Sequence, residues 1–99
     1  MELKHTAVAG TLESSDVLVT VNPGEEGVEL ELTSSVLSQF GKQIKATVLE
    51  TLAMLEVKSA RVAVVDQGAL DCTIRARVQC AVFRAADQAE DIPWGGKIK

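Results

Sequence analysis

The side chains that could take part in chemistry are few in this 99-residue chain, and two adjacent serines are the most conspicuous of them. Ser14 and Ser15 lie in the stretch GTLESSDVLV, between Glu13 and Asp16. Serine and aspartate favour turns, because their side chains bond to nearby backbone groups. An exposed hydroxyl on a tight loop is also what a modifying enzyme needs, since such a loop can enter an active site while the rest of the protein stays folded. The pair is therefore either a polar turn or a modification site.

A serine-hydrolase site is not supported by the surrounding sequence. The only histidine, His5, lies near the N-terminus, and no G-x-S-x-G motif surrounds Ser14. A serine without a partner base is a weak nucleophile. The glycines form neither a G-x-G-x-x-G motif nor a phosphate-binding loop, and the GGK at 95–97 is followed by Ile98. The sequence thus predicts no catalytic centre and no nucleotide site.

The two cysteines, Cys72 and Cys80, are eight residues apart, with no second pair and no nearby histidine to complete a metal site. Eight residues rise about 12 Å along a helix and about 26 Å along a strand. A disulfide needs Cα atoms roughly 4.4 to 6.8 Å apart. We therefore expect two free thiols, packed in the protein, and no bound metal.

The composition indicates one folded domain. Hydrophobic residues make up 46% of the chain and charged residues 24%, which is ordinary for a globular protein. We expect a single domain over residues 1–99, because a chain of this length can bury only one modest core. The polar residues at 87–99, interrupted by proline and glycine, predict an irregular tail in which Trp94 docks on the fold.

The charge balance argues against a nucleic-acid partner. The formal net charge is -4, whereas binding to phosphates relies on an excess of lysine and arginine. The N-terminal MELKHTAVAG lacks the basic start and apolar segment of a signal peptide, and no apolar run approaches the ~20 residues of a membrane span. We expect a cytoplasmic protein that binds neither nucleic acid nor membranes.

The segments on either side of the serines are typical of a β-hairpin. TAVAGTL at 6–12 and DVLVTVN at 16–22 flank the short ESS, and the second segment places Val17, Val19 and Val21 on one face by strict alternation. The serines would then lie at the hairpin tip.

Two more strands are predicted further along the chain. Pro23 and Gly24 suit the central positions of a type II turn, and VELELT at 28–33 then alternates apolar and acidic residues. SARVAVVD at 59–66 is short, rich in valine and apolar on both sides, which favours a buried strand.

Helical periodicity begins after Ser34 or Ser35, either of which is a good N-cap. Apolar residues then recur at spacings of three and four, the stripe of an amphipathic helix. The stripe consists of Leu37, Phe40, Ile44, Val48, Leu52 and Leu55.

The segment 72–86 fits both regular structures. It alternates like a strand as far as Cys80, yet its apolar residues also form a helical stripe, with Asp71 placed to cap it. Length favours a helix, because about 15 residues is long for a strand. The resulting order β-β-β-α-β-α predicts an α+β fold, a small antiparallel sheet with a long helix and a second helix packed on one face.

Four stretches together resemble the acyl carrier protein, or gamma chain, of citrate lyase. They are AVAGTLESSDVLVTVNP, VELELTSSVLSQFGKQI, VLETLAMLEV and DQGALDCTIRARV, and the resemblance runs from Ala7 to about Ala86. GTLESSD and GALDCTIRAR are its most specific parts. The chain departs from the family pattern at Glu56, where glycine is common, and at Gln67, where lysine is common.

The resemblance implies that Ser14 carries a covalent cofactor. In that family the serine after the Leu-Glu dipeptide holds 2'-(5''-phosphoribosyl)-3'-dephospho-CoA through a phosphodiester, and the terminal thiol of this group carries acetyl or citryl as a thioester. The implied partners are an alpha subunit that exchanges acetyl for citryl and releases acetate, a beta subunit that cleaves the citryl form to oxaloacetate, and the transferase that attaches the group. The chain itself would be a non-catalytic carrier.

Two other functions stay open at this point. The chain could be a small non-catalytic binding or adaptor module, with Ser14 unmodified and Arg75, Arg77 and Arg84 as its contact surface. It could also be the related carrier subunit of malonate decarboxylase, which uses the same prosthetic group, although LESSD and GALDC favour the citrate enzyme.

Overall fold

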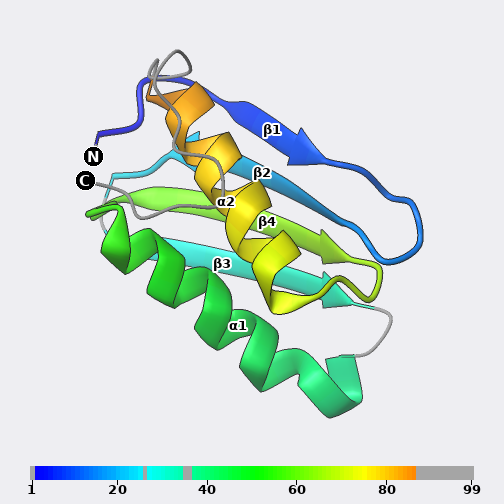
Figure 1. The fold of residues 1–99 in the computed structure, drawn as a ribbon. Coiled ribbons are helices and arrows are strands. Elements are labelled where there is room, and N and C mark those ends of the chain that lie inside the picture. Colours follow the sequence, from blue (N-terminus) through cyan, green and yellow to red (C-terminus); the bar gives the residue numbers. More distant parts are fainter. Residues whose placement is uncertain (1, 26, 35–36, 87–99) are drawn as a thin grey trace.

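One four-stranded sheet carries both helices on the same face (Figure 1). The computed structural model describes residues 2–25, 27–34 and 37–86, so the predicted tail at 87–99 and its Trp94 lie outside the described residues. The α+β class and the order β-β-β-α-β-α are confirmed. The elements are β1 (Ala7–Gly10), β2 (Val17–Pro23), β3 (Val28–Ser34), α1 (Leu37–Met54), β4 (Ala60–Asp66) and α2 (Asp71–Ala85).

The sheet is mixed, whereas the sequence predicts an antiparallel one. The strand order is β1-β2-β4-β3; β2 is antiparallel to both of its neighbours, and β3 is parallel to β4. The reason is the connection between β3 and β4. The 18-residue α1 runs back along the sheet and returns the chain to the end where β3 began, so β4 must run in the same direction as β3.

The core lies between the sheet and the two helices, and the alternation in the sequence selects its residues. Val17, Val19 and Val21 of β2 are fully buried, as the pattern predicts. The apolar residues of β3 are only half-buried, because β3 is an edge strand. The predicted stripe of α1 is confirmed at Ile44, Val48, Leu52 and Leu55. The side chains of Leu37 and Phe40 lie outside the described part of the structure.

The ambiguous segment forms α2, so length was the right criterion. The prediction that Asp71 caps this helix is wrong. The N-cap position is Leu70, which makes no side-chain capping bond, and Asp71 is the first helical residue. Its carboxylate instead accepts a hydrogen bond from the side-chain amide of Gln43 at 3.0 Å, which links the starts of α1 and α2.

Ser34, one of the two predicted caps of α1, is the last residue of β3 and donates its hydroxyl to Asp66 at 2.8 Å. The alternative cap, Ser35, lies outside the described residues. The predicted type II turn at Pro23 and Gly24 is also wrong, since Gly24 does not have the positive φ that such a turn requires. A Cβ on Gly24 would lie 2.7 Å from the backbone nitrogen of Ala60, so glycine is needed there for close approach.

The end of α1 contains a residue in a strained backbone conformation. Glu56 has φ +56, the left-handed region in which glycine is favoured. The Val57 N–H donates to Leu52 O and the Glu56 N–H donates to Ala53 O, each at 3.0 Å, which is the Schellman ending of a helix. Glu56 occupies the position where that motif usually has glycine.

We expect Glu56→Gly to raise the free energy of unfolding by about 1 kcal/mol, because glycine removes the left-handed penalty of about 1–2 kcal/mol and adds a smaller entropic cost. The opposite change is the matched control. Gly68 has φ +84 and open space around its Cα, so Gly68→Ala should lose about 1 kcal/mol through the backbone alone. Urea denaturation measures both, and a destabilised Glu56→Gly variant would contradict the assignment.

Candidate functional site

The serine pair lies at the tip of the loop that joins β1 to β2, as the sequence predicts. This loop, residues 11–16, lies at the same end of the sheet as the loop between β4 and α2, residues 67–70 (Figure 1). The Asp16 N–H donates to Glu13 O at 3.2 Å and closes a turn with Ser14 and Ser15 at its centre. Ser14 is exposed. Its hydroxyl group is therefore open to a reacting partner.

Ser15 is the residue that the turn fixes. It has φ +64, and its N–H donates to Gln67 O at 2.7 Å. The Gln67 N–H donates in return to Asp16 O at 2.9 Å. These two bonds extend the pairing of β2 and β4 past Val17 and Asp66, which are partners in the register. The loop is thus anchored one residue after Ser14.

A glycine on the other side of the loop permits its tight start. Gly10 has φ +97, and a Cβ there would lie 1.8 Å from Val17 O and 3.3 Å from Cδ of Arg77. No other residue fits between the β2 backbone and the Arg77 side chain. β1 consequently ends at Gly10, two residues before the end of the predicted strand at 6–12.

The carboxylate of Asp16 holds the loop against α2. It accepts hydrogen bonds from Arg77 Nε at 3.1 Å and Arg77 Nη2 at 3.0 Å, a paired geometry in which both oxygens are used. It also accepts bonds from the Thr11 hydroxyl at 2.7 Å and the Val17 N–H at 2.8 Å. One side chain therefore joins the first residue of the loop, the start of β2 and the middle of α2.

These donors make Asp16 a stronger acid than usual. The hydrogen bond from the Thr11 hydroxyl, with those from Arg77 and the Val17 N–H and the charge of the guanidinium, lowers the pKa of Asp16 to about 2 against the opposing effect of burial. Asp16 is therefore ionised at neutral pH, and its charge is balanced by Arg77. Of the two acids that flank the serines, only Glu13 remains exposed to solvent.

A second carboxylate organises the neighbouring loop. Asp66 is buried, 1% exposed, and it accepts hydrogen bonds from the Ser34 hydroxyl and from the N–H groups of Gly68 and Ala69. These bonds close the turn after β4 and connect it to the end of β3. This role of Asp66 was not predicted, although an acid at the end of an apolar strand is a common turn former.

The three arginines of the possible contact surface have different partners. Arg77 binds Asp16, and Arg84 donates to Val8 O of the edge strand β1 at 2.8 Å. Arg75 is exposed. Two of the three are thus engaged in holding the fold.

The prediction of free thiols is confirmed for Cys72 and Cys80. The expectation that both are packed in the protein holds for the buried Cys80 and is wrong for the exposed Cys72. Within residues 2–25, 27–34 and 37–86, no cluster of three or more histidine, cysteine or acidic side chains could hold a metal ion. No helix in the same ranges combines the length and the apolar character needed to cross a membrane.

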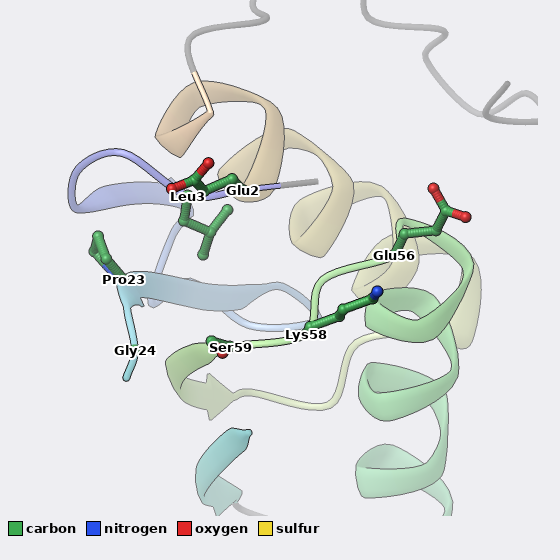
Figure 2. A pocket seen from close by; sticks show the side chains of 7 residues that line it. All are labelled: Glu2, Leu3, Pro23, Gly24, Glu56, Lys58 and Ser59. Atoms are coloured by element: carbon green, nitrogen blue, oxygen red, sulfur yellow. The ribbon is translucent and has the colours of Figure 1, made fainter. Parts of the chain in front are cut away.

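A hollow of about 570 Å³ lies at the other end of the sheet, and Figure 2 shows the side chains around it. It is next to Pro23, the last residue of β2, whereas Ser14 precedes the first, and a seven-residue strand spans about 20 Å. It therefore does not belong to the serine loop. Its lining residues are Glu2, Leu3, Pro23, Gly24, Glu56, Lys58 and Ser59.

Known proteins of the same size resemble this chain over nearly its whole length. A protein from Streptococcus mutans, the citrate lyase acyl carrier protein, is 57% identical over 95 residues, which cover 95% of this chain and 92% of that protein. The proteins of the same name from Escherichia fergusonii and Oenococcus oeni are 55% and 47% identical. They cover 96% and 95% of this chain and 98% and 97% of their own lengths.

A family model for acyl carrier proteins, described as the malonate decarboxylase delta subunit, matches residues 4–85. The fold is also found in a chain of a Pseudomonas malonate decarboxylase hetero-tetramer crystallised with malonate, with a TM-score of 0.60 and 15% identity over 85% of this chain and 87% of that one. The match over residues 4–85 places this chain among the acyl carrier proteins. The chain belongs to the citrate lyase acyl carrier protein family.

We expect Arg77→Gln to raise the pKa of Asp16 from about 2 only in part, because the hydrogen bond from the Thr11 hydroxyl, the largest cause of the lowered pKa, remains. The free energy of unfolding at pH 7 should fall by about 1 kcal/mol, since Arg77 is 40% exposed and solvent screens the pair. The pKa of Asp16 is lowered on folding, so its contribution is complete above about pH 4 and is lost as the pH falls toward 2. The difference between wild type and variant should therefore narrow below pH 4.

Carboxyl titration by NMR and urea denaturation at pH 7 and pH 3 measure this effect. Arg75→Gln is the matched control, because Arg75 is an exposed arginine on the same helix and should leave Asp16 unchanged. An Asp16 pKa that stays near 2 in Arg77→Gln would show that the ion pair does not stabilise the loop.

Proposed function

We propose that this chain is the acyl carrier subunit of citrate lyase and that the Ser14 hydroxyl holds 2'-(5''-phosphoribosyl)-3'-dephospho-CoA through a phosphodiester. The observation that supports the proposal best is the exposure of Ser14 at the tip of a loop whose next residues are fixed. Membership of the citrate lyase carrier family makes this serine, after Leu12 and Glu13, the expected attachment residue.

The surroundings of Ser14 suit a phosphodiester. An attached phosphate keeps one negative charge, which two free carboxylates beside it would disfavour. Asp16 is neutralised by Arg77, so Glu13 is the only flanking acid with an unbalanced charge, and solvent screens it. The hydroxyl can be reached without unfolding the sheet, because the loop projects from the end of β1 and β2 (Figure 1).

The group would supply a terminal thiol that holds the acyl group, and the protein would supply a fixed attachment point. A flexible arm fixed at one end keeps its free end at high local concentration near the sites that it can reach. The bonds of Asp16 and Ser15 define the base of that arm relative to α2 and β4. A carrier of this kind needs no catalytic side chain of its own.

The partners in this proposal are the alpha and beta subunits of citrate lyase and the transferase that modifies Ser14. Together they convert citrate to acetate and oxaloacetate, and the carrier presents the acyl group to each subunit in turn. The carrier subunit of malonate decarboxylase is the second candidate, because the matching family model and the matching structure carry that enzyme's name. Reconstitution with the subunits of each enzyme distinguishes the two candidates.

We expect Ser14→Ala to abolish labelling by the transferase and citrate cleavage with the partner subunits, while the protein stays folded. Ser15→Ala, the adjacent control, should keep both activities and lose at most about 1 kcal/mol of stability, since only its side-chain hydroxyl is removed. Intact mass spectrometry after coexpression with the transferase measures labelling directly. Labelling that survives Ser14→Ala and disappears in Ser15→Ala would overturn the assignment.

A further inference from the structure

Two large apolar side chains lie exposed on the two loops at the Ser14 end of the sheet. Leu12 is 59% exposed and Leu70 is 71% exposed. Leu12 precedes Ser14 by two residues in one loop, and Leu70 ends the other. The bond from the Ser15 N–H to Gln67 O and the bond from the Gln67 N–H to Asp16 O hold the two loops side by side. Large apolar side chains exposed on two adjoining loops are suited to a contact with another molecule.

The surface beside Leu70 is hollow. A depression of about 580 Å³ lies between the start of α2, the β4–α2 loop and α1, and its apolar lining includes Ile44, Ala69 and Leu70. Asp66 lies at its base with its carboxylate already bonded to Ser34 and to the backbone of the loop. The loop that forms this wall is therefore firmly held and offers a preformed surface to a partner.

The acids on this surface point to the charge of the partner. Each exposed leucine is followed directly by an acid, Glu13 after Leu12 and Asp71 after Leu70. The third acid, Asp16, is neutralised by Arg77. An enzyme that delivers a nucleotide-like phosphate ester must bind that anion with cationic groups, and those groups must open toward Ser14. Its surface would thus be positive where the carrier is negative.

We propose that Leu12 and Leu70 form an apolar docking surface for the enzyme that attaches the prosthetic group to Ser14, with Glu13 and Asp71 as its acidic border. This inference rests on the proposed function. The transferase fits this surface better than the lyase subunits do, because it must reach the Ser14 hydroxyl itself. The lyase subunits act at the far end of the arm and do not need to cover Leu12.

The test is the rate at which purified transferase labels the carrier with its activated donor, followed by intact mass spectrometry at carrier concentrations below KM. Leu12→Ser and Leu70→Ser should each lower kcat/KM by about 10- to 100-fold, the effect of losing a buried leucine contact. Met54→Ser is the matched control. Met54 is the last residue of α1, its side chain is 61% exposed, and it lies away from the serine loop. This variant should be labelled at the wild-type rate. Leu12→Ser and Met54→Ser should melt as wild type does, and Leu70→Ser should melt at or above the wild-type temperature, because it places a serine at the N-cap of α2.

Failure of this inference can be told apart from failure of the proposed function. Wild-type protein that is never labelled at Ser14 would overturn both. Labelling of wild type, with equal rates for Leu12→Ser, Leu70→Ser and Met54→Ser, would overturn only the docking surface.

A second assay, citrate cleavage with the lyase subunits, tests whether Leu70 contacts those subunits instead. Leu70→Ser labelled to completion with excess transferase should cleave citrate with the alpha and beta subunits at close to the wild-type rate. A variant that is labelled normally and fails only in that assay would assign Leu70 to a lyase contact and overturn the proposal.

Discussion

The binding of the Asp16 carboxylate to Arg77 and Thr11 is the interaction on which the position of the serine loop depends. The carboxylate accepts hydrogen bonds from the Thr11 hydroxyl in the same loop and from Nε and Nη2 of Arg77. The backbone carbonyl of Asp16 accepts the N–H of Gln67. The β4–α2 loop and α2, both far from Asp16 in sequence, are thereby fixed to the serine loop. Gly10 belongs to the same arrangement, because a side chain at that position would collide with Val17 and displace Arg77. The loop is therefore fixed at Thr11, Ser15 and Asp16, while Ser14 at its tip stays exposed.

Because of this constraint, the residues that stabilise the fold and the residues that position the serine loop lie in different parts of the molecule. The core of valines on β2 and β4 with the apolar stripes of α1 and α2 supplies stability, and the polar bonds are concentrated at the end of the sheet where β2 begins and β4 finishes. A serine at the free tip can take on a covalent group without disturbing that core. The strained residue at the other end, Glu56, does not touch the serine loop and belongs to the ending of α1.

Local patterns in the sequence predicted much of the fold, and long-range contacts account for what they missed. Alternating valines and a three-and-four stripe determine strands and a helix through burial alone, so β2, β4 and α1 were predictable. The parallel pairing of β3 with β4 was not, because it depends on where α1 returns the chain. The exposed turn at Ser14 was predicted from turn chemistry, and its proposed role came from the family resemblance. The pairing of Asp16 with Arg77 spans 61 residues, and no local pattern in a single sequence predicts it.

Hydrogen exchange of the loop amides tests most directly whether the loop is held as described. The Ser15 N–H donates to Gln67 O and the Gln67 N–H donates to Asp16 O, although both residues lie outside regular structure. In the unmodified protein, NMR should show both amides exchanging far more slowly than in an unfolded chain and speeding up together in Arg77→Gln. Exchange of both at the unfolded rate, with the amides of β2 still protected, would contradict the account, because the loop would then be unanchored and Ser14 would have no fixed position.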